Sequence, residues 1–170
     1  MKNTGVRKLC VAAMLTAIAV ILSAFSIPVG ASRCFPIQSL VNVLSAVLLG
    51  PWWALGVAFC TSLIRNILGT GTLLAFPGSM IGALLAGLLY QYTHKLTAAY
   101  FGELFGTGIL GALVAYPIAA FVLKNSAAAL FTYVIPFLIS SLGGVVVAAV
   151  LLVFLVKTKA LDHLKTQMAH

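Results

Sequence analysis

The stretch ELFGTGILGALVAYP, residues 103–117, admits two opposite interpretations, because its glycines are spaced as Gly106-x-Gly108-x-x-Gly111. In dinucleotide-binding folds such glycines follow a β-strand, open a helix and precede an acidic residue by about 20 positions. No strand pattern precedes Gly106, and the next acidic residue after Glu103 is Asp162. The sequence therefore predicts a helix-packing motif here, and not a nucleotide site.

Small residues at helical spacing support the packing interpretation. Gly102, just before this stretch, forms Gly102-x-x-x-Gly106 with it, and GSMIGALLAG, residues 78–87, carries Gly78-x-x-x-Gly82-x-x-x-Ala86. In a bilayer, small residues on one helix face let two backbones approach closely, because dispersion must replace the hydrophobic driving force. We expect both segments to be packing faces of membrane helices.

The composition places those helices in a membrane. Of the 170 residues, 62% are hydrophobic and 7% are charged, and the mean hydropathy is +1.16. A soluble domain carries about 25% charged residues, and one of this length would need them to cover its surface. Long charge-free runs without polar–apolar alternation exclude a β-barrel. We predict an all-α integral membrane protein.

The apolar runs predict six transmembrane helices in one membrane domain over residues 1–170. A bilayer core of about 30 Å takes roughly 20 apolar residues per helix, and Gly50-Pro51 marks a turn inside one long run. The first run is longer than the apolar core of a signal peptide, so we expect it to be retained. The expected helices are approximately 9–27, 37–49, 52–67, 77–93, 100–122 and 131–156.

Basic residues favour cytoplasmic ends for both termini. With the N-terminus inside, seven basic residues lie on the inner side and three on the outer side, which agrees with the positive-inside rule. The same placement explains the net charge of +8 without nucleic acid. We therefore expect a multi-pass protein of a bacterial cytoplasmic membrane. The inner residues are Lys2, Arg7, Lys8, Lys95, Lys157, Lys159 and Lys165, and the outer ones are Arg33, Arg65 and Lys124.

The outer halves of these helices hold the candidate substrate-binding residues. Aromatic walls with a few hydrogen-bonding groups suit a small, flat ligand. Two alternatives stay open: the aromatic residues could form an interfacial belt, and Arg33 could extend to lipid headgroups. The candidates are Arg33, Gln38, Asn42, Arg65, Asn66, Phe76, Tyr116, Tyr133 and Ser140.

Glu103 is the one acidic residue before Asp162. An intramembrane acid can serve substrate or proton chemistry. It can also stabilise the N-terminus of a helix, or contact a partner at the cytoplasmic end of helix 100–122, and we favour that structural or partner-docking role. The chain offers no paired carboxylates and no metal-ligand spacing of histidines or cysteines, so an enzyme is not expected.

Several stretches resemble a known transporter family. AAMLTAIA, residues 12–19, contains Ala13-x-x-x-Ala17, which is similar to the docking element of substrate-binding S components of energy-coupling factor (ECF) transporters. Three further stretches, covering residues 35–54, 65–90 and 102–117, resemble ThiW, the S component for hydroxyethylthiazole. They read FPIQSLVNVLSAVLLGPWWA, RNILGTGTLLAFPGSMIGALLAGLLY and GELFGTGILGALVAYP.

The resemblance implies a six-helix S-component bundle that binds a thiamin precursor from outside, under a lid formed by the first loop and the loop after helix 52–67. It also implies a membrane-embedded coupling protein and two ATPases as partners. Those partners would use the ATP, so no cofactor is expected in this chain. The alternatives are an S component for thiamin, a pyrimidine precursor or another small vitamin, a proton-coupled secondary transporter using Glu103, and a purely structural membrane subunit.

Overall fold

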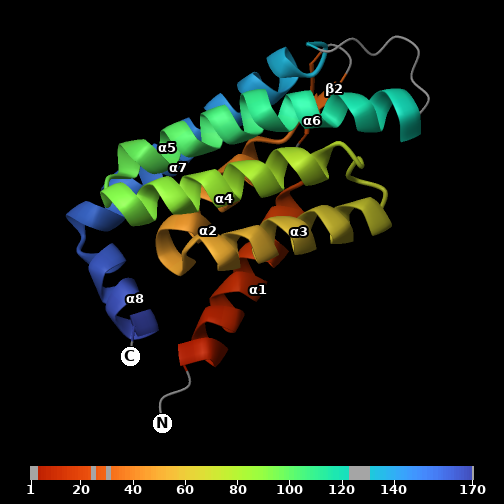
Figure 1. Ribbon diagram of the computed structural model, residues 1–170. Helices are drawn as coiled ribbons and strands as arrows, with labels where there is room; N and C mark the ends of the chain where they lie inside the picture. Colours follow the sequence, from red (N-terminus) through yellow and green to blue (C-terminus); the bar gives the residue numbers. More distant parts are fainter. Residues whose placement is uncertain (1–3, 24–25, 30–31, 123–130, 170) are drawn as a thin grey trace.

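The computed structural model describes residues 4–23, 26–29, 32–122 and 131–169, and it shows helices joined to one short hairpin (Figure 1). Where the sequence predicts helices alone, the structure adds two strands and divides one helix by π-helical segments. The elements are α1 (Thr4–Leu22), β1 (Ile27–Val29), β2 (Ser32–Cys34), α2 (Pro36–Leu49), α3 (Pro51–Ile67), α4 (Ala75–Thr93), α5 (Leu96–Phe105), η1 (Gly106–Gly111), α6 (Ala112–Pro117), η2 (Ile118–Val122), α7 (Val134–Lys157) and α8 (Ala160–Ala169).

The turn between α2 and α3 follows from three residues. Pro36 and Pro51 stand in the first turns of α2 and α3, where a helix needs no backbone N–H donor and the fixed φ of proline is already helical. Gly50 separates the two helices with φ +92°, a conformation that glycine adopts without steric cost. The expected Gly50-Pro51 turn is therefore present.

The expected packing motif is confirmed where α4 runs antiparallel to α5 and η1. A Cβ added to Gly111 would lie 2.4 Å from the Cα of Gly78, and one added to Gly106 would lie 2.7 Å from the Cα of Gly82. These distances are shorter than any van der Waals contact, so the two backbones touch because the side chains are missing. Three such approaches mesh the helices: Gly111 with Gly78, Gly106 with Gly82, and Gly102 with Ala86.

The expected helix 100–122 is a helical run from Leu96 to Val122 that contains two π-helical segments, η1 and η2. The glycines of the opening stretch form η1, and Pro117, which has no N–H to donate, ends α6 before η2. Inserted π segments of this kind occur often at functional sites in helices. One residue of η1, Thr107, lines the pocket described below.

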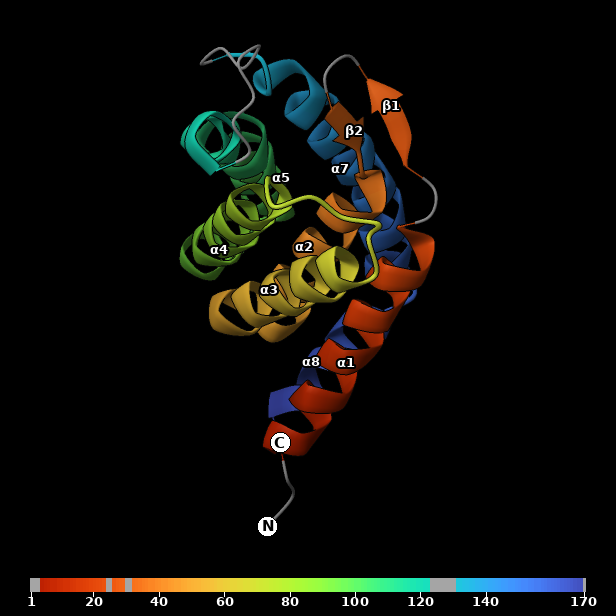
Figure 2. The same cartoon turned by 90° about the vertical axis from the view of Figure 1, so that its right-hand side faces the viewer.

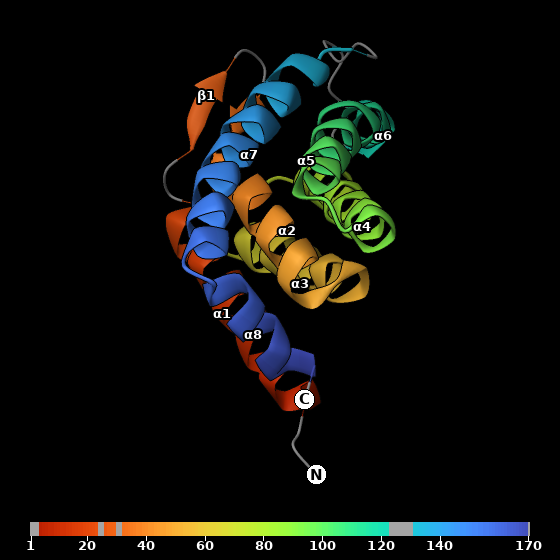
Figure 3. The same cartoon turned by 90° about the vertical axis from the view of Figure 1, so that its left-hand side faces the viewer.

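Within the ranges that the structure describes, three helices are long and apolar enough to cross a membrane: Thr4–Leu22, Leu96–Phe121 and Val134–Lys157. The apolar helix α2 is shorter, with 14 residues. The six-span count and the orientation with both termini inside stay predictions. The two ends of the described chain lie close together in all three views (Figures 1, 2 and 3), where Arg7 Nη1 donates to the carbonyl of Gln167 at 2.8 Å.

Two elements differ from the expected helix list. Residues 160–169 form α8, and the first loop contains the hairpin β1–β2, in which Ile27 pairs with Cys34 (Figure 2). The hairpin is bonded to α7, because Cys34 Sγ donates to the carbonyl of Pro136 at 3.0 Å. The backbone N–H of Phe35 then donates to Ser140 Oγ at 2.8 Å. These bonds hold the start of α2 against the start of α7.

Candidate functional site

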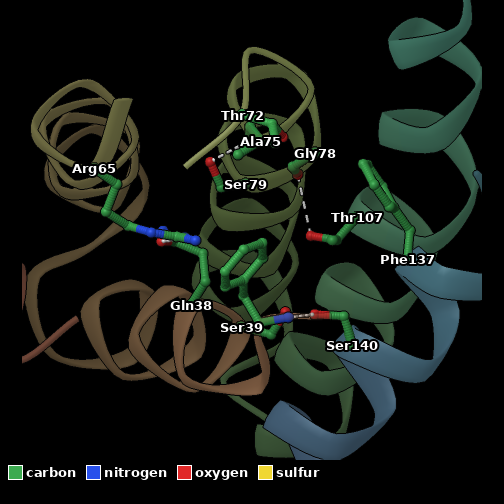
Figure 4. Close-up of a pocket in the computed structure, with 11 residues that line it drawn as sticks. Gln38, Ser39, Arg65, Thr72, Ala75, Gly78, Ser79, Thr107, Phe137 and Ser140 are labelled. Carbon is green, nitrogen blue, oxygen red and sulfur yellow. Dashed lines mark hydrogen bonds between the residues drawn. The ribbon is translucent and has the colours of Figure 1, made fainter. Parts of the chain in front are cut away.

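A pocket lies where α2, α4 and α7 begin and α3 ends (Figure 4). It contains about 440 Å³ of space between its walls, including the part that opens outward. The part of it that a water molecule can enter is much smaller, about 40 Å³, against about 300–1,000 Å³ for pockets that hold small molecules, so a bound ligand would have to widen it. The residues that line it, called the ligand pocket below, are Phe35, Gln38, Ser39, Arg65, Thr72, Ala75, Gly78, Ser79, Thr107, Phe137 and Ser140.

Two phenyl rings and one glycine shape the ligand pocket. Its aromatic walls are Phe35, the residue before α2, and Phe137 of α7. A Cβ on Gly78 would lie 2.9 Å from Cε2 of Phe137, so the ring occupies the space that a side chain at 78 would need. Aromatic walls with small residues between them leave room for a flat ring.

Among the described side chains that line the ligand pocket, Arg65 is the one charged residue. It is only 1% exposed, and its guanidinium carbon lies 3.8 Å from the ring centroid of Phe35. Its Nη1 donates to Gln38 Oε1 at 3.0 Å. Within the described residues, Nε and Nη2 of Arg65 have no hydrogen-bond partner. Arg65 therefore brings a buried cation with two unpaired donors to the wall of the ligand pocket.

Behind Arg65, a chain of hydrogen bonds runs through the helix bundle. Gln38 Nε2 donates to Asn42 Oδ1 at 3.4 Å, and Asn42 Nδ2 donates to Glu103 Oε1 at 3.1 Å. Thr107 Oγ1 donates to the same Glu103 oxygen at 2.9 Å. We call these five residues, Arg65, Gln38, Asn42, Glu103 and Thr107, the polar array. It links α2, α3, α5 and η1 inside an apolar bundle.

Glu103 is fully buried, at 0% exposure. It lies in the interior of α5, opposite Asn42, and not at a surface where a partner could reach it. This burial fits the structural alternative expected for Glu103 and speaks against the partner-docking one. The sequence could not show this, because the partner Asn42 comes from another helix 61 residues earlier.

Only part of the expected substrate set meets at the ligand pocket. Gln38, Arg65 and Ser140 line it, and Asn42 adjoins it through Gln38. Asn66 points elsewhere: its Nδ2 donates to the carbonyls of Ser62 and Thr72, at 2.8 and 3.1 Å. Asn66 therefore ties the α3–α4 loop to the end of α3.

The expected aromatic candidates lie outside the ligand pocket, and Arg33 lies outside the described side chains. Phe76 packs on Phe59 across α3 and α4, with ring centroids 5.8 Å apart. Tyr133 is 2% exposed and packs on the pocket residue Phe137, with ring centroids 6.4 Å apart, but it does not line the ligand pocket itself, and neither does Tyr116 of α6. Arg33 lies in β2, opposite Pro28, and its side chain falls outside the described part of the structure.

Sequence reasoning missed several residues that line the ligand pocket. Ser39 follows Gln38 directly, whereas Ser79 and Thr107 stand beside the packing glycines Gly78 and Gly106. A polar residue next to a packing glycine is placed at a helix contact, where a hydrogen bond can form to the neighbouring helix. That signal was present in the sequence for both residues.

A second cavity runs along α1 and α3 and is called the α1–α3 groove below. It holds about 1,130 Å³ between its walls, including open space. Ala13 and Ala17 of the expected docking element are exposed and line it, together with Trp52 and Trp53. The remaining lining is almost wholly apolar: Leu9, Ala12, Thr16, Val20, Ile21, Gly56, Val57, Cys60 and Ile64.

Apolar helices around an internal pocket that carries a few polar side chains are the arrangement expected of a membrane transport protein. The particular family is also shown: the family model described as thiamine-precursor transporter protein (ThiW) matches residues 9–158. The chain therefore belongs to the ThiW family, and it is a membrane transport protein and not an enzyme. Searches of curated proteins and of solved structures gave no match.

Proposed function

We propose that this chain is the substrate-binding S component of an ECF transporter that imports hydroxyethylthiazole across a bacterial cytoplasmic membrane. Membership of the thiamine-precursor transporter family supports the substrate class. The observation that carries the proposal is the ligand pocket itself, which combines two phenyl rings with the amide of Gln38 and the donors of Arg65. The thiazole ring would lie between Phe35 and Phe137.

The charge of the ligand pocket bears on which precursor it takes. Thiamin carries a positive charge, and so does Arg65, the sole charged side chain that the described part of the structure places in the lining of the ligand pocket. Like charges repel strongly where both are removed from water. This favours a precursor without a positive charge over thiamin, while a neutral pyrimidine precursor is the alternative substrate.

Mass spectrometry of small molecules that remain with the purified chain tests the proposal first, followed by titration with hydroxyethylthiazole. One-to-one binding of the thiazole supports the proposed substrate. A bound pyrimidine would support the proposed class of transporter but would show that its substrate is the pyrimidine precursor. A chain that binds no thiamin precursor at all would overturn the proposed function.

The α1–α3 groove supports a coupling protein as the partner. Small residues on an exposed helix face let another helix approach closely, and Ala13 and Ala17 provide such a face beside Trp52 and Trp53. An S component needs a surface of this kind, separate from its ligand pocket. The coupling protein and its two ATPases would supply the energy from ATP, and this chain itself would need no cofactor.

The double substitution Ala13→Leu, Ala17→Leu should uncouple transport from binding. Leucines would fill the α1–α3 groove, so we expect ATP-dependent uptake to fall by about tenfold or more, because overpacking an interface costs about 1–3 kcal/mol. Binding of hydroxyethylthiazole to the purified chain should stay unchanged. Val150→Leu on α7, whose side chain is 69% exposed, is the control. Equal uptake by both variants would exclude the groove as the docking surface.

Asn66→Ala should weaken the lid over the ligand pocket. The substitution removes the bond to the carbonyl of Thr72, so the α3–α4 loop loses one of its ties. We expect ligand dissociation to become about three- to tenfold faster with little change in association, as most mutations act on the dissociation rate. Thr93→Ala removes a similar side chain–backbone bond at the other end of α4 and serves as the control. Unchanged dissociation in stopped-flow experiments would contradict a lid role.

The buried Glu103 favours one second function, a proton-coupled secondary transporter. A carboxyl group held by Asn42 and Thr107 inside an apolar bundle is a possible proton carrier. Uptake into vesicles separates the two functions. Dependence on the ATPases supports the S component, whereas uptake by this chain alone, driven by a pH gradient, supports the secondary transporter.

A further inference from the structure

The free donors of Arg65 form a matched pair. In a guanidinium group, the Nε–H bond and one Nη2–H bond point in the same direction along one edge of the plane. That edge binds two oxygens of a carboxylate or phosphate at once. These are the two nitrogens of Arg65 without a partner in the described chain, because Gln38 takes Nη1 on the other edge.

The surroundings of Arg65 keep that edge both dry and fixed. The side chain is 1% exposed, and Phe35 covers one face of the guanidinium at 3.8 Å. Figure 4 shows Arg65 extending from α3 to Gln38 on α2 at the side of the ligand pocket. A bidentate partner for this edge would therefore meet a guanidinium already held in place.

No carboxylate of the described chain pairs with Arg65 directly. The buried carboxyl of Glu103 is bonded to Asn42 and Thr107, and Gln38 and Asn42 stand between it and Arg65. A buried cation without a direct counter-charge is costly, and an anion in the ligand pocket would remove that cost. The other polar residues lining the ligand pocket are neutral, among them Ser39, Thr72 and Ser140.

We infer that the ligand pocket takes a thiamin precursor that carries an oxyanion, which binds the Nε–Nη2 edge of Arg65 through two oxygens. The inference rests on the proposed function, since it treats the ligand pocket as the substrate site. A carboxylate on the thiazole ring and a phosphate ester on its hydroxyethyl arm share this chemistry. A single guanidinium matches one negative charge, so the carboxylate should bind more tightly than the doubly charged phosphate ester.

Calorimetric titration of the purified full chain with three thiazoles tests the inference: the neutral alcohol, its phosphate ester and a ring carboxylate. We expect at least one anionic form to bind about tenfold or more tightly than the alcohol, because charge-assisted, bidentate bonds are roughly twice as strong as neutral ones. The order of the two anionic forms identifies the source of the oxyanion. An alcohol that binds as tightly as both anionic forms would overturn the inference.

Two substitutions locate the preference at Arg65. Arg65→Lys keeps the positive charge but loses the planar guanidinium that can bind two oxygens at once, so the anionic form should bind about tenfold more weakly. Arg65→Met should abolish the preference and leave the alcohol and the anions equal. A preference that survives in a folded Arg65→Met chain would overturn the inference, and where that variant does not fold, undiminished anion binding by Arg65→Lys would do so.

Acetate and inorganic phosphate separate this inference from the proposed function. If no thiazole binds but either anion protects the chain against thermal unfolding in an Arg65-dependent way, the oxyanion site stands and the proposed substrate fails. If only the neutral thiazole binds, the proposed function stands and the oxyanion site fails. If neither thiazoles nor anions bind, both fail.

Discussion

Gly111→Ala is expected to destabilise the folded chain by about 3 kcal/mol or more, at the upper end of overpacking costs. The added Cβ would lie 2.4 Å from the Cα of Gly78 and 3.1 Å from the carbonyl oxygen of Gly106. Both neighbours are backbone atoms in helices, which cannot rotate away as a side chain can. Thermal unfolding in detergent, followed by circular dichroism, should show a large drop in the midpoint or a failure to purify as a monodisperse protein.

Gly56→Ala is the matched control for this prediction. Gly56 also lies in a helix, α3, but a Cβ there would meet nothing within 4 Å. Alanine is the better helix former by about 1 kcal/mol, so this variant should be as stable as the natural chain or more stable. Equal midpoints for the two alanine variants would show that α4 and η1 do not meet through their glycines.

Asn42→Leu is the second substitution with a large expected effect, because Asn42 is the central member of the polar array. It is 0% exposed, and leucine would remove its bonds to Glu103, Gln38 and the carbonyl of Ser79. Leaving buried polar groups unpaired costs about 1–3 kcal/mol each, while hydrogen bonds in membrane proteins average about 0.6 kcal/mol. We expect a loss of about 2–3 kcal/mol of stability, measured by unfolding in a denaturing detergent.

The double substitution Asn42→Leu, Glu103→Leu separates the lost bonds from a packing defect. Removing both partners of a buried pair costs less than removing one. The loss of stability in the double variant should therefore be clearly smaller than the sum of the losses in the two single variants. Ser45→Ala, one turn along α2, removes only a local bond to the carbonyl of Asn42 and should cost little. Additive effects at 42 and 103 would show that the polar array is not one unit.

Asn42→Leu should also lower the affinity of the chain for its ligand. In the polar array, the carboxyl of Glu103 accepts from Asn42 Nδ2, so Asn42 offers its oxygen to Gln38, which in turn offers its own oxygen to Arg65. The orientation of each amide therefore depends on the one before it. Asn42→Leu removes the acceptor that fixes the orientation of the Gln38 amide. Gln38 would then no longer hold the guanidinium of Arg65 in place.

Of the expected site, the part that follows from local position was predictable. Gln38 and Arg65 lie in end turns of α2 and α3, and helix boundaries can be estimated from charge-free runs and from Gly50-Pro51. The aromatic walls were not predictable in the same way. Phe76 and Phe137 are both phenylalanines near helix starts, but only the rotation of each helix decides that Phe137 faces the ligand pocket and Phe76 faces Phe59.

The hairpin and α8 were also beyond the sequence argument. Residues 27–34 carry no alternating pattern that would indicate strands, and β1 and β2 are only three residues each. Their position is fixed by bonds from Cys34 and Phe35 to α7, more than 100 residues later. Contacts between such distant residues have no local signature.

The sequence by itself determined that the chain enters a membrane as helices, because composition and the absence of charges act on each segment separately. It also determined which helix faces pack closely, since glycines four residues apart lie on one face in any helix. Only the tertiary structure decided that Gly111 meets Gly78 and that Glu103 reaches Arg65 through Gln38 and Asn42. Those meetings depend on how α2, α3, α4 and α5 are placed and rotated against one another, and that arrangement is a property of the whole packed bundle.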